Sequence, residues 1–134
     1  MHEGWFGNDY FILFSEDEAS SASERYGVGQ ALPGFTIAGL RSWDDFIVRD
    51  RDGGTYTVPT VPLVHEYLER LDVPPAASLE PDERFAGKVK WYVTPLVFGG
   101  DPEGAGNLTW VTHDTHHELV AWWNAMYREV RPPG

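Results

Sequence analysis

The chain has 134 residues, of which 42% are hydrophobic and 14% aromatic, and its formal net charge is −11. This length predicts a single domain over residues 1–134, with enough apolar side chains for a sizeable core. The acidic balance argues against nucleic acid as a partner, because phosphate binding needs a basic patch. There is no cysteine for a disulfide framework and no run of about 18 apolar residues for a membrane span. Glu3 and Asp9 lie where a secretory signal would be basic, so we expect a cytoplasmic protein.

The N-terminal half is predicted to contain several short strands and one helix. Ser15 and Glu18 have the spacing of a capping box, and Gly27 supplies a left-handed C-cap, so a helix is expected over residues 16–26. Gly39 interrupts a strand and indicates a bulge. The expected strands are residues 10–14, 35–38, 46–50 and 55–58, with residues 51–54 as a hairpin loop.

The C-terminal half is predicted to begin with a helix over residues 62–71, capped by Thr60. Residues 73–83 contain three prolines and are interpreted as a surface connection. Two further strands are expected, over residues 88–93 and 108–111, followed by a terminal helix that ends near residues 128–130. On that last helix, apolar side chains recur at helical spacing and are expected to face the core: Leu119, Trp123, Met126 or Tyr127, and Val130.

A histidine cluster opens the terminal helix and is one candidate site. His113 and His117 are four residues apart, the spacing at which two imidazoles share a metal ion. The glutamate that follows the first histidine in metalloprotease helices is missing, and a third ligand would have to come from elsewhere, for example His65. His116 falls on the apolar side. The simpler interpretation is that these histidines are ordinary polar residues of a first helical turn, one of them half-buried and hydrogen-bonded.

Aromatic residues form a second candidate site. Trp122 and Trp123 point to different sides of the predicted helix, so one is expected in the core and the other at the surface. An exposed Trp is a common anchor in protein interfaces, and it can also stack on a sugar. Core packing explains both residues as well.

The adjacent carboxylates Asp44 and Asp45 are a third candidate. Two carboxylates that share a site can raise one pKa into the range useful for acid–base chemistry. Neighbouring residues of a strand point to opposite faces, however, so in a strand the two would not face each other. In a turn, Asp44 would instead bond nearby backbone N–H groups.

Four features of the chain resemble the SUKH superfamily of bacterial immunity proteins, which also contains a yeast cell-wall-assembly-regulator domain. An acidic helix ending at Tyr26-Gly27 leads into Leu32-Pro33. The segment Gly-Leu-Arg-Ser-Trp-Asp-Asp-Phe follows, at residues 39–46. A hairpin over residues 50–58 leads into a proline segment, and the terminal helix is rich in aromatic residues.

The resemblance implies an α+β fold, a single domain with one mixed, mainly antiparallel sheet flanked by helices. It also implies a non-enzymatic protein with no cofactor. Members of the superfamily often neutralise a cognate toxin, in many cases a basic nuclease, by direct binding inside the cell. The acidic charge of this chain is compatible with such a partner.

The sequence therefore predicts a cytoplasmic binding protein with a basic protein partner. Its predicted contact residues are Trp43, Asp44, Asp45 and Trp122. One alternative is a metal-assisted hydrolase that uses His113 and His117. Another is a small-ligand or glycan binder with a cleft lined by Trp91, Trp110 and Trp122.

Overall fold

The computed structural model describes residues 1–101 and 103–130 of the chain. Its strands are β1 (His2–Phe6), β2 (Asp9–Leu13), β3 (Thr36–Arg41), β4 (Asp45–Arg49), β5 (Thr55–Pro59), β6 (Glu69–Arg70), β7 (Val89–Tyr92) and β8 (Leu108–Val111). Its α-helices are α1 (Glu16–Tyr26), α2 (Val28–Ala31) and α3 (His113–Val130). Short 3₁₀ turns are η1 (His65–Tyr67), η2 (Ala76–Ser78), η3 (Leu96–Phe98) and η4 (Ala105–Asn107).

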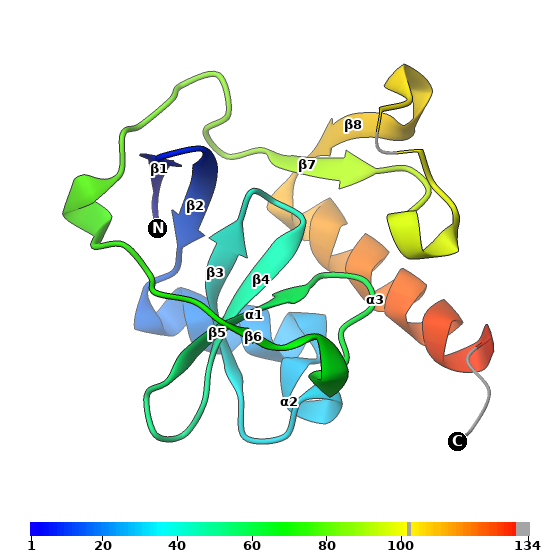
Figure 1. The fold of residues 1–134 in the computed structure, drawn as a ribbon, viewed down its shortest axis with the longest axis horizontal. Helices are drawn as coiled ribbons and strands as arrows, with labels where there is room; N and C mark the ends of the chain where they lie inside the picture. The colour runs from blue at the N-terminus through cyan, green and yellow to red at the C-terminus, as the bar shows by residue number, and fades with distance from the viewer. Residues whose placement is uncertain (102, 131–134) are drawn as a thin grey trace.

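Six strands form one sheet in the order β1-β2-β3-β4-β5-β6, so each strand lies beside its neighbour in sequence. Each of these neighbouring pairs is antiparallel. Strands β7 and β8 form a second, two-stranded antiparallel sheet. Helix α3 runs beside the large sheet and packs on α1 and β7 (Figure 1). The α+β class predicted from the sequence is confirmed, and the second small sheet adds to it.

Helix α1 has the limits that the sequence predicts. The Ser15 hydroxyl accepts a hydrogen bond from the Glu18 backbone N–H, and the Glu18 carboxylate accepts one from the Ser15 N–H. This capping box satisfies two of the orphan donors at the helix start. Gly27 ends the helix with φ 71°, a left-handed conformation that costs glycine little. Ala22 and Tyr26 face the core, as expected.

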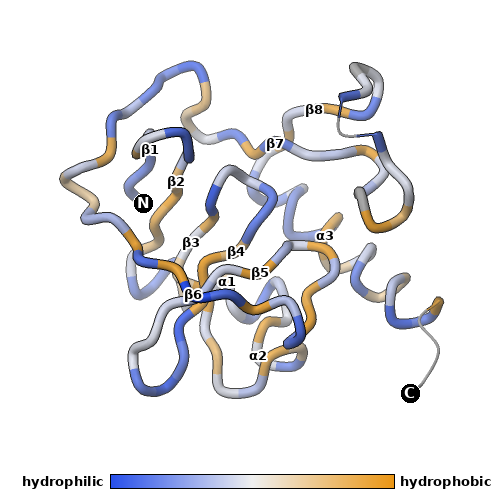
Figure 2. The backbone as a smooth tube through the Cα atoms, in the orientation of Figure 1, coloured by the Kyte–Doolittle hydropathy of each residue, from blue (hydrophilic) through white to orange (hydrophobic). Residues whose placement is uncertain are grey.

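Both faces of the large sheet are covered, which explains why its central strands are almost continuously apolar. Phe46 and Val48 of β4 face the main core under the helices, whereas Ile47 faces a smaller cluster on the other side. The proline-rich segment after β6 covers that second face through Leu79. In Figure 2 the tube is orange along β2 and blue in the β4–β5 hairpin loop. The segment that the sequence suggested was only a surface connection is therefore part of the packing.

Gly39 lies at the predicted irregularity in β3. The pairing register with β4 shifts between Ile37 and Gly39. A Cβ atom at position 39 would lie 2.0 Å from the carbonyl oxygen of Ile12 on the neighbouring strand β2. Glycine is the one residue that fits there without moving a backbone, so the bulge depends on it.

The predicted helix over residues 62–71 is wrong. The structure has the single turn η1 there, followed by the short edge strand β6, which pairs with β5. The carbonyl of Thr60, which would accept the first helical hydrogen bond, accepts one from the side chain of Asn124 on α3. The Asn124 side chain also accepts from the Leu63 N–H. Contacts with a distant helix have replaced the local ones.

Helix α3 buries a line of residues one position away from the predicted stripe: His116, Val120 and Asn124. Leu119 and Trp123 are partly buried against the core as expected, but Val130 is exposed, so its predicted inward position is wrong. Among the helices of the described residues, none combines the length and the apolar character needed to cross a membrane.

Candidate functional site

The turn between β3 and β4 places two carboxylates at one end of the large sheet. Ser42 and Trp43 have left-handed backbones, with φ of 46° and 63°, although neither is glycine. Such a conformation is costly and persists only where the surroundings impose it. The Ser42 N–H donates to the Tyr10 carbonyl (2.6 Å), and the Ser42 hydroxyl donates to the Asp9 carboxylate (3.1 Å). Strand β2 thus holds the turn that presents Asp44.

Trp43 is buried, with 6% of its surface exposed. Its ring stacks on Tyr10 with the ring centres 4.7 Å apart. Three more rings contact it edge-on, those of Trp5, Phe85 and Trp110. The residue predicted to lie at the contact surface therefore anchors the turn from behind.

Asp44 sits between a cation and two aromatic rings. The Lys90 ammonium lies 3.5 Å from the Asp44 carboxylate, over the Trp43 ring at 5.6 Å and the Tyr92 ring at 5.3 Å from their centres. The side chain of Asp44 is 38% exposed. Burial raises its pKa to about 6; the charge of Lys90 opposes this rise, and the charge of Asp45 adds to it. Asp44 is consequently close to its titration point near neutral pH.

Asp45 begins β4 in a strongly acidic environment. Burial raises its pKa; the guanidinium of Arg41 opposes this, and the charges of Asp9 and Glu69 reinforce it. Arg41 is shared, because it also forms an ion pair with Asp9 at 3.1 Å. We call this region the acidic end of the sheet, and its charged side chains are Asp9, Asp44, Asp45, Glu69, Arg41 and Lys90. Acids outnumber bases in it.

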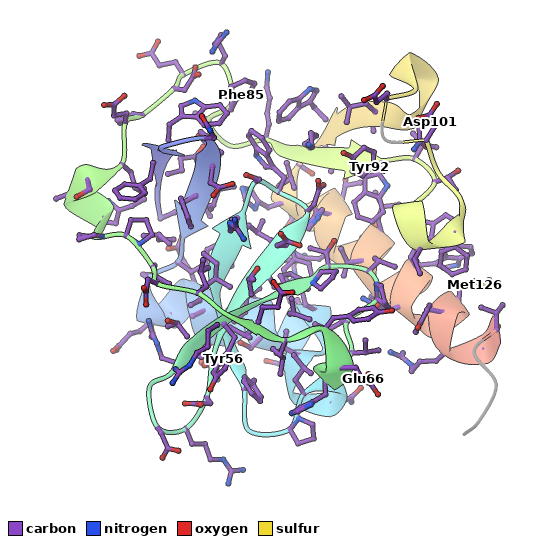
Figure 3. The ribbon with its side chains drawn as sticks, viewed as in Figure 1. Tyr56, Glu66, Phe85, Tyr92, Asp101 and Met126 are labelled. Carbon is purple, nitrogen blue, oxygen red and sulfur yellow. The ribbon has the colours of Figure 1, made fainter. Side chains whose placement is uncertain are left out.

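A cavity of about 260 Å³ opens beside these carboxylates, and we call it the Asp44 cavity. Its lining residues come from the β3–β4 turn and the start of β4, from the end of β5 and the segment after it, and from β7 and the residues after it: Asp44, Asp45, Pro59, Thr60, Val61, Trp91, Tyr92 and Pro95. Figure 3 shows the Tyr92 ring projecting from β7 toward the large sheet. The walls are thus mostly apolar and aromatic, with the acids on one side.

Thr60 contributes the buried polar group of this cavity, with 6% of its surface exposed. Its N–H donates to the Asp44 carbonyl (2.9 Å), and its own carbonyl accepts from Asn124 (2.8 Å). These two backbone bonds fix the position of Thr60 in the cavity wall.

The predicted histidine cluster is a packed layer between α1 and α3. His116 is fully buried; its Nδ1 lies 2.5 Å from the Tyr26 hydroxyl, and the Trp91 ring lies edge-on at 5.4 Å. Burial lowers the pKa of His116 to about 3, and the neighbouring charges of His113 and His117 add to this. Burial also lowers the pKa of His117 to about 4 and that of His113. All three imidazoles are therefore neutral at pH 7.

The metal alternative gains no support from this geometry. Within residues 1–101 and 103–130, no three His, Cys, Asp or Glu side chains are grouped so that they could hold a metal ion. His65, suggested as a third ligand, lies against Phe35. The Asp114 carboxylate is 4.0 Å from His117 Nδ1 and pairs with Arg25 at 2.8 Å.

The predicted aromatic residues do not share one cleft. Trp91 is buried and lines the Asp44 cavity. Trp110 stacks on Phe85, away from that lining. Trp122 is 56% exposed, contacts Trp123 on α3 and is not a lining residue of the Asp44 cavity, so the expectation that one residue of this pair is exposed is confirmed.

A larger groove of about 1000 Å³ lies between α1, α2, the η1 segment and the C-terminal half of α3. Its lining carries both signs of charge, with Glu24 and Glu66 as well as Arg25 and Arg128. Nothing in it favours one class of ligand, and the Asp44 cavity is the more informative site.

Lys90, Tyr92 and Thr60 were missed by reasoning from the sequence. Lys90 and Tyr92 alternate along a strand with Trp91, which indicates two faces but not which face meets Asp44. Thr60 was interpreted as a helix cap. The positions of Lys90 and Tyr92 near Asp44 depend on how the β7–β8 sheet docks, which no local pattern encodes. Thr60 lies there because Pro59, at the end of β5, pairs with Asp45 of β4.

No family model, curated protein or solved structure matches this chain. The functional assignment therefore depends on the chemistry of the site.

Proposed function

We propose that this chain is a non-enzymatic cytoplasmic binding protein, an immunity or interaction module of the SUKH type, that neutralises a basic partner protein by direct binding. The observation that carries the proposal is the acidic end of the sheet, where carboxylates outnumber cations beside an apolar cavity. The net charge of −11 gives the whole molecule the same sign. Complementary charge accelerates encounter with a basic partner and selects against acidic ones.

The surroundings of Asp44 favour cation binding as the use of this site. Lys90 is already held by one carboxylate and two aromatic rings, the combination that proteins use to bind cationic groups. An interface also benefits from apolar area at its centre with charges around it. The cavity walls supply the first, and the acidic end of the sheet supplies the second.

The test is a capture experiment followed by a measured affinity. The immobilised protein is incubated with native cell lysate at low salt. Bound proteins are eluted by raising the salt concentration and are identified by mass spectrometry. The purified partner is then titrated calorimetrically at about 50 mM and about 500 mM salt, which shortens the screening length several-fold. We expect a basic partner whose affinity falls as salt rises.

The matched variants locate the contact. Changing Asp44→Asn together with Asp45→Asn should weaken the complex, whereas Asp72→Asn, an exposed acid outside the cavity, should not. A partner that is not basic, or an affinity that does not change with salt, would rule out the proposed electrostatic recognition.

A further inference from the structure

We propose that the Asp44 cavity receives the guanidinium group of an arginine side chain from the partner. The inference rests on the proposed function, because it identifies the chemical group that the acidic end of the sheet recognises. It is carried by three features of the cavity: its size, its walls, and the charge and acceptor capacity of its carboxylates.

The size fits one long side chain. At about 260 Å³ the cavity falls just below the roughly 300–1,000 Å³ range of sites that enclose drug-sized ligands. Because it opens at the end of the sheet, a side chain can enter it while the rest of the partner stays on the surface. One inserted side chain of this kind is a common way to anchor an interface.

The walls suit a flat cation. Trp91 and Tyr92 provide aromatic surface, on which a guanidinium stacks better than an ammonium does. Pro59 and Pro95 have no backbone N–H, so they offer no donor to an anion. A cationic and planar group is therefore favoured over a carboxylate or phosphate.

The polar groups complete the match. An ionised carboxylate has about four acceptor positions. Lys90 lies 3.5 Å from the Asp44 carboxylate, longer than the roughly 2.7–2.9 Å of a strong charge-assisted hydrogen bond. Asp44 therefore keeps acceptor capacity for the paired N–H groups of a guanidinium. Thr60 lines the same cavity, and a hydroxyl oxygen can also accept an N–H bond.

Charge favours the same ligand. Asp44 and Asp45 both line the cavity, and the charge of Asp45 helps to raise the pKa of Asp44. Lys90 and Arg41 offset part of that negative charge, and Arg41 is shared with Asp9. An added cation would restore the balance, and since the described residues form no metal-binding group, an organic cation is the better candidate.

The experiment titrates Nα-acetyl-arginine amide into isotope-labelled protein and follows backbone amide NMR signals. We expect shifts that saturate at millimolar ligand and centre on Thr60, Trp91 and Tyr92. Nα-acetyl-citrulline amide, which has nearly the same shape but no charge, should cause none. Equal shifts with citrulline, or shifts confined to the larger groove, would overturn the inference.

Variants give the second readout. Asp44→Asn should weaken the arginine compound by about tenfold, as expected for loss of a charge-assisted hydrogen bond. Asp45→Asn should weaken it less, and it serves as the test if Asp44→Asn does not give a well-dispersed NMR spectrum. Asp72→Asn removes the same charge from an exposed position outside the cavity and should bind normally. Unchanged affinity in both cavity variants would refute the assignment.

The outcomes separate this inference from the proposed function. Arginine binding in the cavity, with no basic protein captured from lysate, supports the cavity and removes the proposed function. Capture of a basic partner whose affinity does not change with Asp44→Asn or Asp45→Asn supports the function and removes the cavity as its arginine site.

Discussion

His116 should make the protein strongly acid-sensitive. It is fully buried between α1 and α3, with its Nδ1 bonded to the Tyr26 hydroxyl and the Trp91 ring against it. Burial lowers its pKa from 6.5 to about 3 in the folded protein. In the unfolded chain the imidazole has its ordinary pKa, so the unfolded state takes up a proton first as the pH falls.

The magnitude follows from linkage. A group whose pKa is lowered by folding contributes its full stabilisation to the folded state above the unfolded pKa of 6.5. That stabilisation is lost as the pH falls toward the folded pKa of about 3. Each pH unit in this window costs about 1.4 kcal/mol. Between pH 7 and pH 4, His116 alone should therefore lower the free energy of unfolding by about 3 kcal/mol.

The perturbation is the double variant Tyr26→Phe with His116→Phe. It removes both hydrogen-bonding partners together, because leaving one buried group unpaired would cost about 1–3 kcal/mol at every pH. Urea unfolding is followed by Trp fluorescence at several pH values, with constant slopes as the check on two-state behaviour. Between pH 7 and pH 4, the free energy of unfolding of the variant should fall by about 3 kcal/mol less than that of the wild type. His2→Gln, which removes an exposed histidine, should leave the wild-type dependence unchanged.

Parallel curves for the wild type and the double variant would show that His116 titrates normally in the folded protein. The argument from burial would then be wrong for this residue.

Three further predictions test the fold and the site. Gly39→Ala should lower the free energy of unfolding, measured in urea, by about 3 kcal/mol or more, because the new Cβ would lie 2.0 Å from the Ile12 carbonyl oxygen. Gly29→Ala is the control: a Cβ there has nothing within 4 Å, so the free energy of unfolding should change by less than about 1 kcal/mol. Asn124→Ala should cost about 2–4 kcal/mol in the same assay, since a backbone N–H and a carbonyl in the segment after β5 lose their bonds to it; a loss below about 1 kcal/mol would mean that water replaces them. Binding of the acetyl-arginine amide should be about tenfold weaker at pH 5 than at pH 7, because the pKa of Asp44 is raised to about 6 and its carboxylate loses its charge in this range. An affinity that is the same at both pH values would show that Asp44 is not the acceptor.

Local elements were predictable where neighbours in sequence decide them. The limits of α1 followed from Ser15, Glu18 and Gly27, because a cap involves only residues within one turn. The irregularity at Gly39 and the hairpin joining β4 to β5 were predictable for the same reason. The absence of a helix after Thr60 was not predictable, because the Thr60 carbonyl accepts its hydrogen bond from the side chain of Asn124, 64 positions away.

The candidate site was predictable only in part. The pattern around Asp44 and Asp45 drew attention to a turn that lines a cavity, and one exposed residue of the Trp122-Trp123 pair was expected, without a choice between the two. Trp is a residue type that is common in protein interfaces, yet Trp43 is buried against four other aromatic rings. Adjacent residues are expected to face opposite sides of a strand, but a turn in the left-handed region lets Asp44 and Asp45 line one cavity.

The sequence by itself determined the α+β class, the first helix, most strands and the acidic character of the molecule, since these depend on composition and on contacts a few residues apart. Only the tertiary structure decided that Lys90, Tyr92 and Thr60 surround Asp44, and that His116 is buried against Tyr26. The partners in that site come from the β3–β4 turn, the segment after β5 and β7, and those in the histidine layer from α1 and α3. The distances between these partners depend on how the two sheets and the helices pack. That packing is determined by burial of the whole hydrophobic core, and no single segment of the sequence determines it.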